Sequence, residues 1–337
     1  MIGPKLLTAI LLCGLLSCEQ PAQAASTSSL AALRRQLGPE RTLGIIVWDP
    51  KPILKLPDFF PLAVRSGIDT VWICGYPFRA LNRTQKQTIL TAASDAGLKT
   101  IGFIDGDVGW PEQSEFVAYH YRDLTSQLSR LDLGRLHLAF ATDIEVYAIP
   151  AKDRQAGRIW DGRLERYITL LKETVLPPIE AFSRQKRHPD GGFVVQGSLL
   201  TRFEPWWYQN GRRTEQGVTV SGLGPVERTE IAAMSYRNKV ADLLQVSRIV
   251  RQRAAKDSVA FLFGVETIPA KEAAAPSFAG KEGTIGPVLL QVCDQFSLED
   301  QKRLGGVFIH TRNPLIAYKI LKTLELGGPE EPDSGLR

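Results

Sequence analysis

Histidine and cysteine are scarce in this sequence, and neither is spaced as a metal site requires. The chain has four His among 337 residues, at positions 120, 137, 188 and 310, without the short spacings of zinc ligands. It also has four Cys, and two of them lie in an N-terminal targeting segment. Cys74 and Cys293 lie in apolar segments. They are predicted to be two buried free thiols, and a disulfide between them is the alternative. We therefore expect no metal and no other cofactor.

A basic surface pattern and a glycine-rich phosphate loop are also missing. The net charge is +5, but basic residues alternate with acids and form no stripe with aromatics, so we expect no nucleic-acid partner. The first apolar run ends in Trp48-Asp49-Pro50 instead of glycines, which argues against a dinucleotide-binding fold. A content of 44% hydrophobic and 23% charged residues is typical of a globular chain. The length predicts one large domain, and we expect a monomer.

The chain begins with a targeting segment. Lys5 precedes an apolar run over 6–16 that is too short for a confident membrane span, and small residues follow it. Residues 1–24 are therefore predicted to be a signal peptide, with Ala22-Gln23-Ala24 at the cleavage site. Residues 25–40 are interpreted as a tether that joins this segment to the folded domain.

A second processing route is also open at the N-terminus. Leu15-Leu16-Ser17-Cys18 resembles the bacterial lipobox, which implies membrane attachment through a lipidated Cys18. Both routes predict an exported protein. It would be periplasmic, lipid-anchored to the envelope or secreted.

A short apolar run followed by a helix-length segment recurs eight times after the tether. The predicted strands cover 42–49, 70–77, 98–105, 135–145, 191–198, 230–238, 259–267 and 305–313. The predicted helices cover 84–96, 112–131, 164–185 with a break at Pro177-Pro178, 239–255, 285–304 and 314–324.

This alternation over 41–326 is typical of a single (β/α)8 TIM barrel of the α/β class. A doubly wound open sheet is the alternative fold. We also expect inserted loops after strands 5 and 7, and a disordered tail over 327–337.

The fourth apolar run ends in Asp143-Ile144-Glu145, at the end of a barrel strand where active sites form. Alternate strand residues share a face, so both carboxylates point the same way. Buried charges are energetically unfavourable unless they are paired or take part in binding or catalysis. Because a neighbouring carboxylate raises the pKa of an acid, this pair suits general acid catalysis. We predict Glu145 as the general acid and Asp143 as its catalytic neighbour.

The other predicted strand ends carry acidic, aromatic and amide side chains. They are Trp48, Asp49, Tyr76, Asp105, Gln196, Tyr236, Arg237, Glu266 and His310. Two carboxyl groups flanked by aromatic rings are typical of the active sites of glycoside hydrolases. We therefore predict Glu266 to be a nucleophile or a substrate-binding acid, and the remaining residues to bind a carbohydrate substrate.

Two short motifs resemble the family 18 glycoside hydrolases, the chitinase-like barrels. They are Asp143-Ile144-Glu145 on strand four and Met234-Ser235-Tyr236 on strand six. The resemblance implies that Glu145 is the general acid, that Tyr236 holds the substrate N-acetyl group, and that the substrate amide is the nucleophile. The chain departs from the family at Leu138 and Ala141, where the motif has Asp, and at Arg237, where Asp is common. Strand eight also lacks the family's Trp.

The placement of Glu145 and Glu266 resembles a second group, the retaining cellulase-like clan, which has one Glu on strand four and another on strand seven. Ile144 stands where that clan has Asn. Both resemblances imply a glycoside hydrolase, and with the N-terminal targeting segment they predict an exported enzyme that acts on a polysaccharide or cell-envelope glycan. The alternative is a non-catalytic glycan-binding or envelope-assembly protein on a degenerate barrel.

Overall fold

The structure, a computed structural model, describes residues 29–107, 109–143, 166–167, 169–196, 200–203, 230–268 and 277–326. The predicted signal peptide with Cys18, the tail over 327–337, and Glu145 lie outside these residues. So does most of the sequence predicted to form inserted loops after strands 5 and 7.

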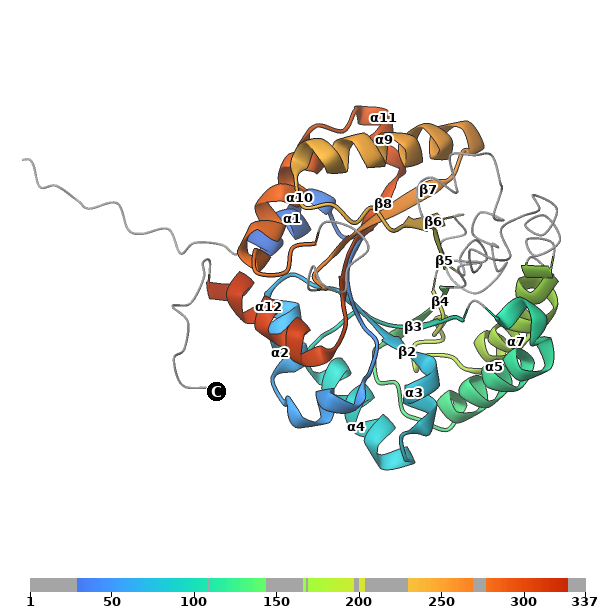
Figure 1. The fold of residues 1–337 in the computed structure, drawn as a ribbon. Helices are drawn as coiled ribbons and strands as arrows, with labels where there is room; N and C mark the ends of the chain where they lie inside the picture. Colours follow the sequence, from blue (N-terminus) through green and yellow to red (C-terminus); the bar gives the residue numbers. More distant parts are fainter. Residues whose placement is uncertain are drawn as a thin grey trace, which may run out of the picture.

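Eight parallel strands close into a barrel in sequence order, which confirms the predicted fold class (Figure 1). They are β1 Thr42–Val47, β2 Thr70–Cys74, β3 Thr100–Asp105, β4 His137–Thr142, β5 Leu200–Phe203, β6 Glu230–Ala233, β7 Ala260–Glu266 and β8 Leu304–Thr311. Strand β8 pairs with β1 from Thr42↔Gly306 to Val47↔Thr311. Because the first and last strands pair, the sheet has no free edge.

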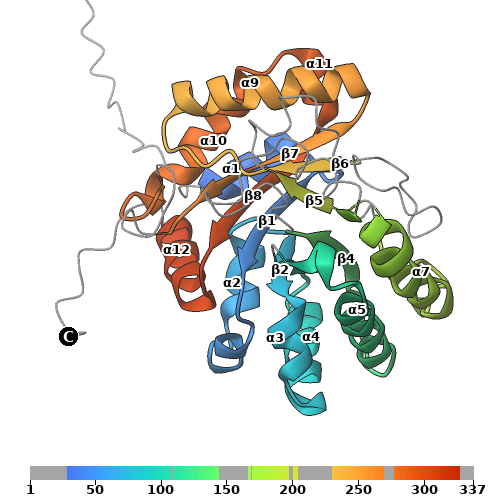
Figure 2. The ribbon, with the colours of Figure 1, turned by 45° about the vertical axis from the view of Figure 1, so that its right-hand side comes forward.

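Helices surround the barrel, as Figures 1 and 2 show. The α-helices are α1 Ser29–Leu37, α2 Phe59–Arg65, α3 Gly75–Ala80, α4 Arg83–Asp95, α5 Ser114–Ser129, α7 Leu176–Gln185, α9 Val240–Asp257, α10 Ile285–Asp294, α11 Leu298–Arg303 and α12 Pro314–Leu326. Short helical turns are η1 Lys51–Lys55, η2 Trp110–Glu112, η5 Glu282–Thr284 and the π-helical η4 Leu170–Val175.

Local sequence explains two departures from the predicted helices. The helix predicted over 285–304 is two helices, because Ser297 accepts a hydrogen bond from the Asp300 N–H and so begins α11. The expected break at Pro177-Pro178 occurs at Leu176, where η4 gives way to α7. Both prolines lie in the first turn of α7, where a missing N–H is tolerated.

The segment predicted as a tether is helical from Ser29 onward. Leu30, Leu33 and Leu37 of α1 are fully or almost fully buried, and α1 packs against α10. Arg34 on the same helix forms an ion pair with Asp69. The three leucines recur at helical spacing, so burial of one apolar stripe stabilises α1 on the barrel. The folded domain therefore begins before residue 41.

The fifth strand lies later in the chain than predicted. Within the predicted run 191–198, Val195 forms an isolated parallel bridge with Leu138 of β4. The paired strand β5 is Leu200–Phe203, where Arg202 and Phe203 continue the sheet to β6. The predicted run therefore lies beside the first half of β4, and the strand end lies several residues beyond it.

Strand alternation fixes which residues point into the barrel. Phe103 of β3 contacts Phe78 of α3, so it faces the helices and its neighbour Gly102 faces the interior. A Cβ atom at Gly102 would lie 2.0 Å from the Trp72 ring, and one at Gly264 would lie 2.0 Å from the Phe308 ring. These two large rings fill the barrel interior over glycines of neighbouring strands.

Candidate active site

The ends of β7, β8 and β1 bring three predicted site residues together. Glu266 pairs with His310 across β7 and β8, and each shares a strand face with an interior residue, Gly264 or Phe308. Trp48 follows the last residue of β1, on the side of the barrel where β1 meets β8. The barrel therefore presents these side chains at its mouth, the C-terminal end of the strands.

Two close polar contacts connect these side chains. The Trp48 Nε1 atom lies 2.6 Å from the His310 Nε2 atom. An indole N–H can only donate, so His310 Nε2 accepts, and the ring proton of a neutral His310 is on Nδ1. This tautomer is assigned from the hydrogen bonds. His310 Nδ1 lies 3.3 Å from Glu266 Oε1, so an imidazole nitrogen and a carboxylate oxygen are in close contact.

Tyr236, three residues beyond β6, stacks on the imidazole of His310. The ring centroids are 5.5 Å apart and the rings are inclined by 19°. Glu266 is 5% exposed and His310 is 7% exposed. A carboxylate removed from water is unfavourable by several kcal/mol unless it is paired, so the burial of Glu266 beside His310 marks it as a candidate functional acid.

Backbone hydrogen bonds hold the ends of β7 and β8 in place. The Phe278 N–H donates to the Glu266 carbonyl at 2.7 Å, and the Ser277 hydroxyl donates to the same oxygen at 3.1 Å. The N–H and hydroxyl of Thr267 both donate to the His310 carbonyl at 3.0 Å. The positions of Glu266 and His310 are therefore set by the main chain as well as by their side chains.

Asp143 lies at the mouth at the end of β4. The Thr142 hydroxyl, one residue earlier, bonds the buried Tyr167 hydroxyl at 3.0 Å, on the helix side of the sheet. Alternation then turns Asp143 toward the interior, where it is half-buried. Its N–H donates to the Asp105 carbonyl at 2.9 Å. Glu145, the predicted general acid, lies outside the described residues.

Asp105 was expected to line the cleft, but its side chain faces the helices. It shares a strand face with Phe103, which packs on α3. Its Oδ1 atom accepts the Tyr76 N–H at 2.8 Å, and its Oδ2 atom lies 3.1 Å from His120 Nε2. Arg79 Nη1 lies 2.6 Å from His120 Nδ1, and a guanidinium only donates, so the ring proton of a neutral His120 is on Nε2, the nitrogen nearer Asp105.

Three further predicted residues make other contacts. Exposed Asp49 accepts the Lys51 N–H at 2.9 Å and so shapes the turn into η1. The Gln196 side chain lies 3.1 Å from His137 Nε2, at the opposite end of the barrel, because strand β5 begins only after it. Arg237 donates to the Tyr236 carbonyl at 2.7 Å, immediately beside the mouth.

The sequence prediction missed the residues around Tyr76. His120 is fully buried, and Arg79, Phe116 and Tyr119 lie in ring or cation contact with Tyr76 or with one another. The only signal was the aromatic-rich first half of α5, which also fits an ordinary packed helix. The nearby Cys74 thiol has its pKa raised by burial and, secondarily, by the charge of Asp105.

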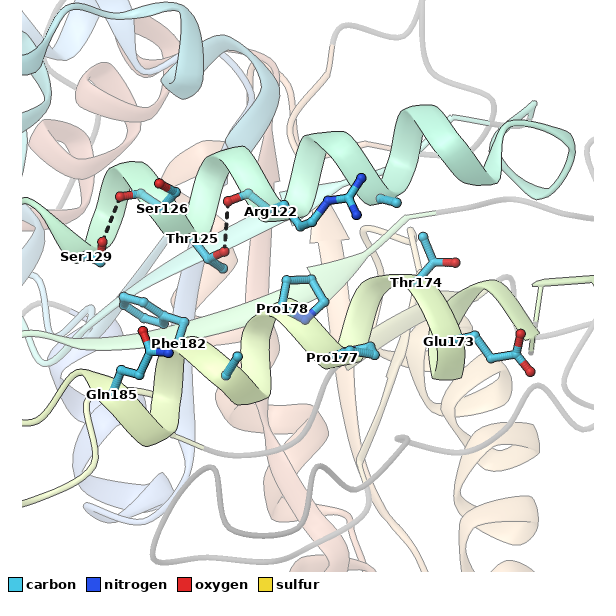
Figure 3. Close-up of a pocket in the computed structure, with 12 residues that line it drawn as sticks. Arg122, Thr125, Ser126, Ser129, Glu173, Thr174, Pro177, Pro178, Phe182 and Gln185 are labelled. Atoms are coloured by element: carbon cyan, nitrogen blue, oxygen red, sulfur yellow. Dashed lines mark hydrogen bonds between the residues drawn. The ribbon is translucent and has the colours of Figure 1, made fainter.

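A separate groove of about 470 Å³ lies between α5 and α7, on the outside of the helix ring (Figure 3). Arg122 and Glu173 lie among its lining side chains. The hydroxyls of Thr125 and Ser129 in its wall already donate to carbonyls of α5 itself. None of the predicted site residues lines this groove, so it is distinct from the barrel mouth.

Within the described ranges, no cluster of three or more His, Cys, Asp or Glu side chains could hold a metal. Among those same residues, none of the helices has the length and apolar character needed to cross a membrane. Cys74 and Cys293 are both free thiols.

Comparison with known proteins adds little beyond the fold. No family model matches the chain, and no curated protein matches it. Similar solved structures include a putative deoxyribose-phosphate aldolase from Toxoplasma gondii ME49 (10% identity, TM-score 0.46, covering 91% of this chain and 97% of that one). A GH18 chitinase from Pseudoalteromonas aurantia has 14% identity and TM-score 0.45, covering 84% of this chain and 99% of that one.

An exo-beta-1,4-mannosidase, Op5Man5, from Opitutaceae bacterium strain TAV5 is also similar, at 12% identity and TM-score 0.46. The match covers 85% of this chain and 55% of the mannosidase. All three TM-scores are below 0.5, and the three proteins are named for different reactions, so the matches select no function.

Proposed function

We propose that the protein is an exported glycoside hydrolase that acts on a polysaccharide or cell-envelope glycan at the mouth of the barrel. The observation that carries the proposal is the placement of Glu266. This carboxylate is 5% exposed, ends a barrel strand, and lies 3.3 Å from the Nδ1 atom of His310. A nearly buried acid held at the C-terminal end of a barrel strand is suited to chemistry there.

The proposed mechanism uses two carboxyl groups. Glu145 donates a proton to the leaving glycosidic oxygen, and Asp143, two residues earlier, raises the pKa of Glu145 by its negative charge. Glu266 is the second acid. It attacks the anomeric carbon as a nucleophile, or it binds the substrate while the substrate's own amide attacks.

His310 and Trp48 have a positioning role in this proposal. The His310 Nδ1 atom lies 3.3 Å from Glu266 Oε1, and the Trp48 indole N–H fixes the tautomer of a neutral His310. Tyr236 stacks on His310 and is almost buried, so it supports the His310 imidazole at the edge of the proposed sugar site. Aromatic rings beside a pair of acids provide both a surface for the sugar and groups that orient it.

One observation favours the alternative of a glycan-binding barrel without catalysis. The positions where family 18 has further Asp residues carry Leu138 and Ala141, which are buried apolar residues here. A barrel that has lost these acids can retain its carbohydrate surface without turnover. Turnover that depends on Glu145 therefore decides between the two functions.

The test compares wild-type protein with Glu145→Gln and with Asp143→Asn on soluble oligosaccharides, followed by product analysis. Glu145→Gln keeps the shape of the side chain but cannot donate an acidic proton, and we expect turnover to fall by about 10²–10⁴-fold. Asp143→Asn should lower the pH above which activity declines, because the pKa of Glu145 falls. Wild-type turnover in Glu145→Gln would contradict the proposal.

Export is proposed from the N-terminal sequence and is tested separately. Mass spectrometry of the protein from its native host should find a mature chain that begins at Cys18 or Ala25. A diacylglycerol adduct on Cys18 would select the lipid-anchored form, and an intact Met1 would contradict export.

A further inference from the structure

Three exposed aromatic side chains gather on one patch outside the barrel mouth. Tyr76 is 55% exposed, Phe116 is 40% exposed and Tyr119 is 57% exposed, and we name these three residues the aromatic patch. The Tyr76 and Phe116 ring centroids are 6.3 Å apart. The Arg79 guanidinium lies 5.8 Å from the centroid of Tyr76 and 5.2 Å from that of Tyr119, so it joins the two rings.

Buried groups hold the aromatic patch in this arrangement. The Tyr76 ring stacks on His120 with centroids 6.0 Å apart, and Asp105 accepts the Tyr76 N–H at 2.8 Å. Asp105 and His120 are themselves almost completely buried and lie in contact. Arg79 is fixed by a 2.7 Å ion pair with Asp123. Rings held in place before a ligand arrives lose little conformational entropy when it binds.

We propose that the aromatic patch binds successive sugar rings of a neutral glycan chain that extends out of the barrel mouth. This inference rests on the proposed function and adds that the substrate is a polymer. Tyr76 lies two residues beyond the end of β2, so the patch begins at the same end of the barrel as Glu266. A chain that leaves the mouth meets Tyr76 first and then the rings on α5.

The surrounding charges favour a neutral glycan over an anionic surface. Glu112 and Glu115 lie close in sequence to Phe116, and Asp123 pairs with Arg79. The guanidinium of Arg79 therefore offers little free positive charge to phospholipid headgroups.

The area of the aromatic patch argues against a protein partner. Its three half-exposed rings present roughly 300 Å². A stable protein interface needs about 800 Å² on each partner, so the patch is too small to be one on its own.

Calorimetric titration with sugars of two lengths tests the proposal. The probes are the hexasaccharide and the disaccharide of β-1,4-linked N-acetylglucosamine, and the same pair for β-1,4-linked mannose. The variant is Phe116→Ser combined with Tyr119→Ser, on the exposed surface of α5. We expect it to bind a hexasaccharide about tenfold or more weakly than wild type, and a disaccharide with unchanged affinity.

A matched control replaces Leu298 and Leu315, two exposed apolar residues elsewhere, with Ser. This control should bind both lengths as wild type does. The proposal would be overturned if the patch variant bound the hexasaccharide as tightly as wild type does, or if it lost equal affinity for both lengths. It would also be overturned if wild type bound neither hexasaccharide. Patch-dependent sedimentation with phosphatidylglycerol vesicles would overturn it too, because it would identify a membrane as the occupant.

The two proposals fail separately. Affinity and cleavage are separate readouts, so a patch-dependent affinity can stand while Glu145→Gln leaves cleavage unchanged. Conversely, cleavage that depends on Glu145 with length-independent binding would keep the proposed function and reject the polymer site.

Discussion

The Oε1 atom of Glu266 lies 3.3 Å from the Nδ1 atom of His310 at the mouth of the barrel. Because Trp48 donates to the other ring nitrogen, the proton of a neutral His310 is on Nδ1, the nitrogen beside the carboxylate. The strands fix this relationship, since Glu266 and His310 are register partners of β7 and β8. Three residues far apart in the sequence therefore form one unit.

Replacing His310 with Phe should impair turnover without unfolding the protein. Phe retains a ring beside Tyr236 but cannot donate to Glu266, and misplacement of a reacting group by about 1 Å can lower the rate by roughly 10²-fold. We expect kcat to fall by about that factor with little change in KM. Trp48→Phe removes only the indole donor and should have a smaller effect. Equal kcat for His310→Phe and wild type would contradict the positioning role.

Filling the space under Phe308 should destabilise the barrel. The added methyl of Gly264→Ala would meet the Phe308 ring at 2.0 Å, and overpacking of this kind costs about 1–3 kcal/mol. The control Gly283→Ala has its nearest contact at 3.8 Å and should change stability by less than about 0.5 kcal/mol. Urea denaturation compares the two free energies of unfolding. Equal values would contradict the described interior packing.

The pair His137 and His188 should make stability fall in mild acid. Burial, and secondarily the charge of His188, lowers the pKa of His137 below its ordinary value. The unfolded chain, with a His pKa of about 6.5, therefore binds more protons than the folded chain as the pH falls below that value. This contribution is complete above about pH 6.5 and is lost as the pH falls toward the folded pKa.

Denaturation at several pH values between about 7.5 and 5 checks this sign. The free energy of unfolding should fall less steeply with acidification in His137→Gln than in wild type. His188→Gln removes the second cause and leaves burial, so it should retain part of the wild-type slope. A steeper slope in His137→Gln would show that the pKa is shifted in the other direction.

Both thiols should react slowly while the protein is folded. Burial raises the pKa of the Cys74 thiol, and it raises that of Cys293 to about 12. The thiolate is the reactive form, so alkylation by iodoacetamide at pH 8 should be much slower in native protein than in guanidinium. Intact-mass measurement follows both rates. Rapid native labelling of Cys293, or a native disulfide, would contradict the structure.

The fold was predictable because a barrel strand and its helix each leave a local pattern. Periodicity predicts seven of the eight strands, whereas the predicted fifth strand comes before β5 because apolar residues already stand beside β4 at Val194 and Val195. The tether prediction fails from Ser29 onward because Leu30, Leu33 and Leu37 recur at helical spacing and are buried. Local sequence patterns therefore predict the order of strands and helices more reliably than the residues at which each element begins and ends.

The candidate site was only partly predictable. Listing strand ends was enough to collect Trp48, Glu266 and His310, because parallel strands end together. It could not show that Asp105 faces the helices, which depends on which strand residue is last and on its partner in α5. The strand ends also give no sign of His120, which lies inside a helix. The sequence of an amphipathic helix does not show whether a buried histidine only packs or also forms hydrogen bonds.

The most direct test of the central claim is a crystal structure of the Glu145→Gln variant with an uncleaved oligosaccharide. We expect a sugar in the barrel mouth, with the scissile oxygen within hydrogen-bond distance of the amide that replaces the Glu145 carboxyl group. Glu266 should lie on the other side of that bond, and its carboxyl group should lie within roughly 10 Å of that amide. A sugar bound away from Glu266, or a separation much larger than this, would contradict the proposed active site.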